Sequence, residues 1–344
     1  MNDGVSVVIC CYNSASRITT VLEYLSNQEI NHPIPWEVVL VDNASDDETT
    51  VAARRAWKSD IIPLHIVIEP KKGLSNARRK GIQESHYEFV SFIDDDNWVN
   101  TRWIEGVYSS MKNNPDVALV GGRGEAVFEK EEPEWFGRFQ QSFAVGPQAA
   151  ADGIMKDADS FLYGAGLVLR KSVWDKIIDR GFEFQLSGRT GKMIASGEDS
   201  EMCYAIKLAG YDLYYDSTLT FKHYMSEGRM SVPYLIRLAG SFGKASVITN
   251  MYISLLNNSQ GLDRLKIQNY FLALLHALYN ILLVLPDYFR NKKFKSKFIQ
   301  SEYDLAFSIQ NLKRKLQLFG RYRKYVHIIK NADWHNLHER IHIN

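Results

Sequence analysis

The strongest constraint on the fold of this chain is a regular alternation of short apolar runs and longer stretches with helical spacing. The apolar runs cover residues 5–10, 36–42, 64–68 and 89–93. Helical patterns cover residues 14–27, the segment through 54–58, and 75–85. Strands interleaved with helices in this way predict a parallel sheet with helices on both faces, and continuously apolar strands predict burial on both sides. We therefore expect an α/β fold.

Three of these predicted strands end in polar or acidic residues. Cys11, Tyr12 and Asn13 follow the first strand, Asp42 ends the second, and an acidic triplet follows the fourth. In an open parallel sheet, ligands bind beyond the carboxyl ends of the strands. We therefore expect these residues on a single rim. A sheet needs only turns at that edge, so the acidity indicates a binding site.

The acidic triplet Asp94-Asp95-Asp96 is the sharpest single feature. Three adjacent carboxylates repel one another, and a divalent cation removes the repulsion. Hard oxygen ligands suit Mg²⁺ or Mn²⁺. Residues i and i+2 of an extended strand share a face, so Asp94 and Asp96 point together. His223, in TFKHYM, is a candidate third ligand. The alternatives are a solvated acidic turn and a structural histidine.

Four other residues are candidates for the site. Asp42 suits a nucleotide base or ribose hydroxyl, or an Asx-type turn. Arg78 lies in the first turn of a helix, where capping favours acids, so it suits a diphosphate or base contact, or the role of a surface helix arginine. Glu198 and Asp199 open the helix EDSEMCYAIKLAG. They suit a carboxylate base near an acceptor hydroxyl, or acids placed there by the helix dipole.

Taken together, these segments resemble family 2 of the inverting glycosyltransferases, which have the GT-A fold. The resemblance runs from residue 5 to about residue 229. VSVVICCYN, with Cys11, Tyr12 and Asn13, looks like the opening strand that contacts the nucleotide. VVLVDNASDDET is similar to the segment whose first aspartate, here Asp42, binds the base. KGLSNARRKGI looks like the segment whose arginine, here Arg78, approaches the base and phosphate.

The remaining motifs follow in the family's order. SFIDDDNWV resembles the metal-binding triplet, and YGAGLVLRKSVWDKI followed by ASGEDSEMCYAIKLAGYDLYY resembles the acceptor-side strand and base-bearing helix. The resemblance implies inversion at the anomeric carbon, with Asp199 as base and Glu198 orienting the site. Asp96 would hold Mn²⁺ or Mg²⁺ with Asp94 and His223, while Asp94 and Asp95 would also contact the nucleotide-sugar, a UDP-sugar being the first expectation.

The signature QxxRW of processive synthases is missing, and HYMSEGRMSVPYLIRLAG stands in its usual place. This favours addition of a single sugar, in surface polysaccharide or glycan biosynthesis. A nucleotidyltransferase acting on sugar phosphates is the alternative, but CCYNSAS lacks a basic glycine-rich phosphate loop. A non-catalytic glycan-binding protein is the third, although it would not need Asp96 and Asp199 together. No strand is followed by GxGxxG, which disfavours a dinucleotide-binding oxidoreductase.

The composition limits which binding partners and which cellular compartment we expect. The net charge of +1 disfavours a nucleic-acid-binding protein. Three cysteines, Cys10, Cys11 and Cys203, provide no disulfide framework, and the chain enters a strand pattern without a recognisable signal peptide. We therefore expect a cytoplasmic protein, or one at the cytoplasmic face of a membrane.

The second part of the chain differs from the first. We expect a GT-A domain over residues 1–230, with a nucleotide-sugar half (1–124) and an acceptor half (125–230), and a helical, basic region over 231–344. Residues 269–286 (NYFLALLHALYNILLVLP) could form a buried core helix, a helix lying in a membrane surface, or a short or re-entrant span. Residues 288–330 contain twelve Lys or Arg and two acids. This asymmetry suits peripheral contact with an anionic leaflet and a glycan or lipid-linked acceptor.

Overall fold

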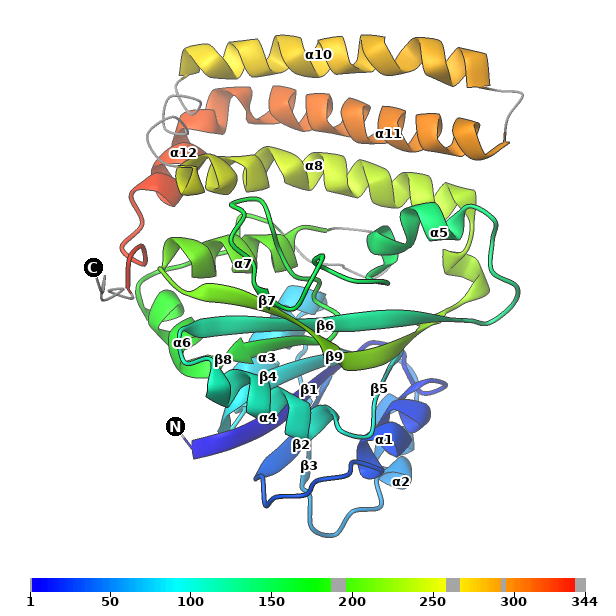
Figure 1. Ribbon diagram of the computed structural model, residues 1–344, viewed down its shortest axis with the longest axis vertical. Helices are drawn as coiled ribbons and strands as arrows, with labels where there is room; N and C mark the ends of the chain where they lie inside the picture. Colours follow the sequence, from blue (N-terminus) through cyan, green and yellow to red (C-terminus); the bar gives the residue numbers. More distant parts are fainter. Residues whose placement is uncertain (1, 187–195, 258–266, 292–294, 338–344) are drawn as a thin grey trace.

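The structure is a computed structural model and describes residues 2–186, 196–257, 267–291 and 295–337. Its lower part is a sheet with helices on both faces, and its upper part is a layer of long helices (Figure 1). The strands are β1 (Asn2–Cys11), β2 (Trp36–Asp42), β3 (Leu64–Ile68), β4 (Tyr87–Asp94), β5 (Asn97–Val99), β6 (Val117–Phe128), β7 (Gly153–Ile154), β8 (Leu167–Arg170) and β9 (Asp212–Met225).

The helices of the sheet domain and of the upper layer follow in chain order. They are α1 (Ile18–Ser26), α2 (Thr49–Ala56), α3 (Leu74–Glu84), α4 (Trp103–Asn113), α5 (Phe136–Phe139), α6 (Lys171–Asp179), α7 (Glu198–Leu208), α8 (Val232–Leu256), α10 (Ile267–Arg290), α11 (Lys295–Leu318) and α12 (Tyr322–Lys330).

The sheet has a parallel half and a mixed half. Its strand order is β3-β2-β1-β4-β8-β6-β9-β5, with β7 paired to β9. The first four strands are parallel. Beyond β4, strand β8 is antiparallel to both of its neighbours, whereas β6 and β9 are parallel to each other. The prediction of a mostly parallel sheet therefore holds for the first half only.

Strand β1 shows why helices cover both faces of this sheet. Its side chains alternate in direction, as the pleat of a strand requires. Val8 packs into a core with residues of α3, α6 and α7, whereas Val7 and Ile9 pack into a second core with residues of α1 and α4. All three side chains are fully buried. A strand buried on both faces is mostly apolar, and the one polar residue of the run Val5–Cys11 is Ser6, whose hydroxyl donates a hydrogen bond to Glu37 Oε1.

The sequence analysis missed several elements and divided one wrongly. The elements β5, α4, β6 and α6 were not predicted. From the sequence alone, residues 213–223 are interpreted as two short strands, whereas the structure has a single strand there, β9. Strand β6 contains Gly121, Gly122 and Gly124, which weaken a strand pattern. A Cβ on Gly122 or Gly124 would collide with a backbone carbonyl oxygen, that of Leu219 or Ala144 respectively. These glycines permit close packing between neighbouring segments.

The helical layer is joined to the sheet domain by a shared core. Ile248 and Tyr252 of α8 lie in the same buried cluster as Trp174 of α6 and Met202 of α7. Helices α8, α11 and α10 lie side by side, with α10 outermost (Figure 1). On α10, the ring of Tyr270 stacks on Tyr322 with centroids 3.8 Å apart.

Most of the apolar surface of α10 faces away from the protein. The apolar part of this helix, Asn269–Arg290, has a mean hydropathy of 1.5 over its most apolar window, and only 17% of that window is buried. The alternative of a buried core helix does not fit this exposure. The exposed large apolar side chains are Phe271, Leu272, Leu275, Leu278, Tyr279, Leu282, Leu283 and Phe289.

A buried carboxylate joins α7, α8 and the segment that follows α6. Glu201 is fully buried and accepts hydrogen bonds from the backbone N–H groups of Gln185 and Leu186, each at 2.8 Å, and from the hydroxyl of Tyr252 at 2.7 Å. Burial raises the pKa of Glu201 to about 7, although the three donors oppose the shift.

This shift predicts a pH dependence of stability. The folded chain holds the Glu201 proton more tightly than the unfolded chain, so the contribution is greatest below about pH 4.5 and is lost as the pH rises through about 7. A pKa shift of this size corresponds to about 3 kcal/mol in the free energy of unfolding. Relative to Glu201→Gln, which cannot titrate, the wild type should lose up to that much between pH 4.5 and 7.5. Urea unfolding at both pH values measures the difference, with the exposed Glu183→Gln as control. Parallel pH profiles for wild type and Glu201→Gln would contradict the prediction.

Candidate active site

The predicted rim exists because β2, β1 and β4 are adjacent and in register. Cys11 pairs with Asp42, and Cys10 pairs with Asp94, so these strand ends lie side by side. A cavity of about 1190 Å³ opens at this edge. Its walls include the acidic triplet, the amino end of α7, and residues of α8 and α11. Ligand sites commonly span about 300–1,000 Å³, so this cavity has room for two substrates.

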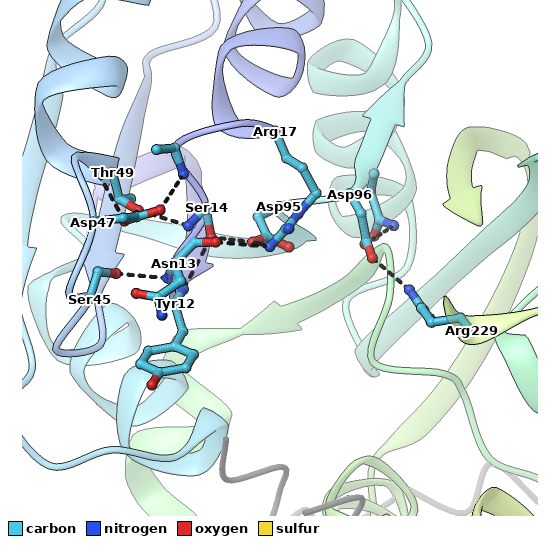
Figure 2. Close-up of polar contacts among 12 residues, drawn as sticks. Tyr12, Asn13, Ser14, Arg17, Ser45, Asp47, Thr49, Asp95, Asp96 and Arg229 are labelled. Atoms are coloured by element: carbon cyan, nitrogen blue, oxygen red, sulfur yellow. Dashed lines mark hydrogen bonds and ion pairs between the residues drawn. The ribbon is translucent and has the colours of Figure 1, made fainter. Parts of the chain in front are cut away.

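Asp95 is bound by residues of the segment that follows β1. Its carboxylate accepts hydrogen bonds from the hydroxyl of Ser14 and from Arg17 Nη2, the latter at 2.6 Å (Figure 2). Burial raises the pKa of Asp95, and the charge of Asp96 adds to the shift, while Arg17 opposes it. The ion pair with Arg17 therefore favours the charged form of Asp95 and fixes the loop against the triplet.

Asp96 faces a different arginine and the predicted histidine. Its Oδ2 lies 2.6 Å from Arg229 Nη1 (Figure 2), and its Oδ1 lies 3.5 Å from His223 Nε2. Burial alone would lower the pKa of Arg229, but the Asp96 carboxylate raises it above the ordinary value. His223 is 4% exposed, and its Nδ1 has no hydrogen-bond partner among the residues that the structure describes. The structure thus brings His223 to Asp96, as the sequence analysis expected.

The residues of the triplet fit a divalent cation. Asp94, Asp95 and Asp96 line the cavity with hard oxygen donors, and His223 lines it beside them. Burial raises the pKa of Asp94, Arg78 opposes the shift, and the Asp96 charge raises it further. A cation would relieve the repulsion that these groups exert on one another. In this structure the guanidinium of Arg229 supplies a positive charge at Asp96.

Arg78 connects the acidic triplet with the predicted base. Its guanidinium is 5% exposed and lies 5.6 Å from the centre of the Phe92 ring. Nη1 forms an ion pair with Asp199 Oδ1, and Nη2 lies 4.0 Å from Asp94 Oδ1. Burial alone would lower the pKa of Arg78, but Asp199, Asp94 and Glu198 raise it above the ordinary value. Arg78 is a buried cation shared between two walls of the cavity.

Asp199 has a second partner on the opposite oxygen. Its Oδ2 accepts a hydrogen bond from the backbone N–H of Gly164 at 3.0 Å. A Cβ on Gly164 would collide with both Arg78 and Asp199, so only glycine allows this approach. The side chain of Asp199 remains 34% exposed, at the cavity wall. Both oxygens are oriented, and each keeps a lone pair for another donor.

Glu198 lies beside Asp199 but is more deeply buried. It is 4% exposed, and its Oε2 accepts a hydrogen bond from Ser75 Oγ at 2.7 Å. Burial raises the pKa of Glu198, while Arg78 and the hydrogen bond from Ser75 oppose the shift. The Ser75 contact joins the start of α3 to the start of α7. Glu198 thus fixes the helix that carries Asp199.

The predicted nucleotide-side residues divide into two groups. Cys11 and Tyr12 line the cavity, and Lys72 Nζ lies 3.1 Å from the Tyr12 hydroxyl. Asp42 and Asn13 do not line it. Asp42 Oδ1 accepts the Ser45 N–H at 3.0 Å, which is the Asx-type turn left open as an alternative. Asn13 has a positive φ of 53° and donates its N–H to Ser45 Oγ at 3.0 Å (Figure 2). Its Oδ1 accepts a hydrogen bond from the Asp46 N–H, in the same turn, at 2.8 Å.

Sequence reasoning missed several residues of the site. Arg229 lies in HYMSEGRMS, the segment that stands in the place of QxxRW, and only its position was noted. Arg17 and Gly164 gave no signal, because their partners lie 78 and 35 residues away in the sequence. The cavity wall formed by Leu238 and Phe242 of α8 was also missed. A helical pattern alone does not show which face meets a site.

Comparison with known proteins agrees with this geometry. Residues 6–178 match the model of glycosyl transferase family 2. A glucosyl-dolichyl phosphate glucuronosyltransferase of Haloferax volcanii is 25% identical over 67% of this chain and 72% of its own length. A cholesterol galactosyltransferase of Borreliella burgdorferi is 32% identical, but over only 33% of this chain and 31% of its own.

Among solved structures, a mannosyltransferase of Pyrobaculum calidifontis, in complex with GDP-Man and Mn²⁺, has a similar fold. It superimposes with a TM-score of 0.54 at 18% identity, over 91% of this chain and 88% of that one. The fold is GT-A. The chain belongs to glycosyl transferase family 2. The family decides against the nucleotidyltransferase and the non-catalytic glycan-binding protein.

Proposed function

We propose that this enzyme transfers a single sugar from a nucleoside-diphosphate sugar to an acceptor hydroxyl, with inversion at the anomeric carbon, in the biosynthesis of a surface glycan or polysaccharide. The observation that carries the proposal is the position of Arg78, which pairs with Asp199 and lies 4.0 Å from Asp94. One guanidinium thus separates the proposed donor side from the proposed base. An inverting displacement needs a leaving-group site and a base close together on one cavity.

On the donor side, the diphosphate would meet the acidic triplet and its arginines. Mn²⁺ or Mg²⁺ on Asp96, with Asp94 and His223 as further ligands, would act as a Lewis acid for the leaving diphosphate. Arg229, now paired with Asp96, is placed to turn towards the phosphate oxygens. Tyr12 and Lys72 would bound the nucleotide, beside the turns that Asp42 and Asn13 hold. We propose a UDP-sugar as the first donor to test, with GDP-sugars beside it.

On the acceptor side, Asp199 would accept the proton of the attacking hydroxyl. The acceptor oxygen forms a bond to the anomeric carbon, the bond from that carbon to the diphosphate breaks, and the nucleoside diphosphate leaves with the electron pair. Arg78 and the Gly164 N–H orient the Asp199 carboxylate for this transfer. Glu198 holds the helix that carries it.

We further propose a lipid-linked acceptor. The cavity extends from the catalytic rim to an apolar wall made of Leu238 and Phe242 of α8 and Phe307 of α11. Such a wall suits the apolar part of an amphiphilic acceptor. The names of two relatives support the idea, since one acts on a dolichyl phosphate and one on cholesterol. In this proposal, residues 1–124 would bind the donor and residues 125–230 the acceptor. Residues 231–344 would bind the lipid part of the acceptor.

A lipid-linked acceptor requires contact with a membrane, and α10 offers the surface for it. The helix Asn269–Arg290 has 22 residues, about 33 Å, and its exposed face is apolar. Because α10 lies alongside α11 (Figure 1), we propose that it docks in the membrane surface and does not cross it. Exposed basic residues nearby, including Arg290, Arg323 and Lys324, suit an anionic cytoplasmic leaflet.

The first prediction concerns the metal. Asp96→Asn should abolish Mn²⁺-dependent binding of a nucleoside diphosphate while the chain remains folded, because Asp96 lies at the cavity wall and not in an apolar core. Calorimetry with UDP and with GDP, each with and without Mn²⁺, measures the effect, and circular dichroism checks the fold. Asp60→Asn, at an exposed site outside the cavity, is the matched control. Unchanged Mn²⁺-dependent binding in Asp96→Asn would show that Asp96 is not a ligand.

The second prediction concerns the base. Asp199→Asn should lower turnover by roughly 10²–10⁴, the range for loss of a general base, with donor affinity nearly unchanged. Single-turnover transfer from a radiolabelled nucleotide-sugar to extracted lipid, over a donor concentration series, separates turnover from binding. Asp179→Asn, exposed at the end of α6, serves as control. Near-normal turnover would leave Asp199 as a partner of Arg78 without a catalytic role.

The third prediction concerns membrane docking. Replacing Leu272, Leu275 and Leu282 by Gln should weaken binding to anionic vesicles at least about 100-fold, since each exposed leucine contributes about 1.5–3 kcal/mol on burial. The matched control replaces Ile61, Ile154 and Ile178, which are also exposed but lie outside α10. Flotation with vesicles at 0.1 M and 1 M salt measures binding.

Salt separates the modes of attachment. Surface docking should weaken at 1 M salt, where the Debye length is about 3 Å and basic residues no longer attract anionic lipid. Attachment that resists salt and needs detergent would indicate a span. Full-length protein that stays unbound at low salt would end the membrane proposal.

A further inference from the structure

A cluster of three metal-binding side chains lies away from the catalytic rim. Glu37 of β2, His65 of β3 and His86, in the segment before β4, each direct one ligand atom towards the others, and the three atoms lie within 4.8 Å of one another. Glu37 Oε2 is 2.8 Å from His86 Nδ1 and 3.3 Å from His65 Nε2. The reaction proposed for the rim uses none of these residues.

The carboxylate of Glu37 is fixed in its orientation before any ion binds. Its side chain is 2% exposed. Oε1 accepts hydrogen bonds from Ser6 Oγ at 2.6 Å and from the His86 N–H at 2.7 Å. These two donors hold one oxygen and leave Oε2 directed at the imidazoles. A buried carboxylate with one oxygen anchored by its own fold resembles a ligand that second-sphere hydrogen bonds have oriented.

His65 and His86 are the other two candidate ligands, and both are exposed to solvent. Their side chains are 43% and 67% exposed for His65 and His86, and the ring centroids lie 5.5 Å apart. Both imidazoles present a ring nitrogen to the same carboxylate oxygen. A metal would use these same three atoms as ligands. Ligands of tetrahedral Zn²⁺ stand about 3.3–3.5 Å apart, so small rotations of two exposed rings suffice.

The geometry points to a Zn²⁺ site formed by Glu37, His65 and His86, with the fourth position left to water. Imidazole nitrogen suits Zn²⁺ and disfavours Mg²⁺, whereas the carboxylates of the rim favour Mg²⁺ or Mn²⁺. The chain would therefore hold two metals of different kinds. Glu37 and Asp42 are five residues apart on β2, which is about 16 Å along the strand. The zinc would join β2, β3 and the segment before β4, and would stabilise the nucleotide-binding half without touching substrate.

The test is Zn²⁺ binding by the full chain without an affinity tag, stripped with chelator and kept in saturating Mg²⁺. Calorimetry should find one tight Zn²⁺ equivalent, and Co²⁺ used as a probe should give the visible absorption of a four- or five-coordinate site. Zn²⁺ should also raise the melting temperature. His65→Gln with His86→Gln keeps N–H donors for Glu37 but removes both nitrogen ligands. Affinity should fall by at least the roughly 10–100-fold that loss of even an outer partner costs.

Two controls separate this site from the others. His32→Gln changes an exposed histidine outside the cluster and should bind Zn²⁺ as the wild type does. Asp96→Asn changes the catalytic rim and should also retain the Zn²⁺ equivalent and the melting shift. If Asp96→Asn loses the Zn²⁺, or if the double histidine variant binds it as the wild type does, the proposed site is wrong. Absence of any Zn²⁺ uptake by the wild type overturns it equally.

Discussion

The ion pair between Arg78 and Asp199 is the interaction on which the rest of the site depends. A guanidinium with 5% exposure is costly to bury unless carboxylates surround it, and Asp199, Asp94 and Glu198 do so. Arg78 comes from α3 and its partners from β4 and α7, so the pair joins the two halves of the cavity. Gly164 suits this approach, since a Cβ there would collide with Arg78 Nη2 and with Asp199 Oδ1. The site is thus held together by ion pairs between side chains of different elements.

Much of the fold followed from local patterns, because β1, β2 and β4 are largely buried on both faces and are therefore mostly apolar. Strand β3 lies at the edge of the sheet and is partly exposed. Trp36–Asp42 and Leu64–Ile68 match the predicted bounds in full. The second half of the sheet was harder to predict. Strand β6 carries glycines where other segments approach, and β9 alternates between buried and exposed positions over 14 residues. Such strands depend on neighbours that the sequence does not identify.

The candidate site, too, could be predicted only in part. Residues at the ends of adjacent strands could be placed on one rim, since parallel register brings Cys10 beside Asp94 and Cys11 beside Asp42. The interaction partners of these side chains could not be predicted from the sequence. Asp96 meets Arg229 across 133 residues, and Arg78 meets Asp199 across 121. The same limit applied to Glu37, His65 and His86, which share no sequence motif. Glu37 and His65 meet because β2 and β3 are adjacent in the sheet, and His86 reaches Glu37 from the segment before β4.

The helical layer lines one side of the cavity and presents an apolar helix on its outer side. Helix α8 shares a core with α6 and α7, so it belongs to the sheet domain and cannot move freely from it. Its residues Leu238 and Phe242, with Phe307 of α11, face the cavity, while α10 presents leucines and aromatics outward on the far side of α11. An apolar wall inside and an apolar face outside are thus carried by one helical layer. In the membrane docking that we propose, this layer would set the distance between the cavity and the membrane surface. An acceptor whose lipid stays in that surface would then need only its head group to reach Asp199.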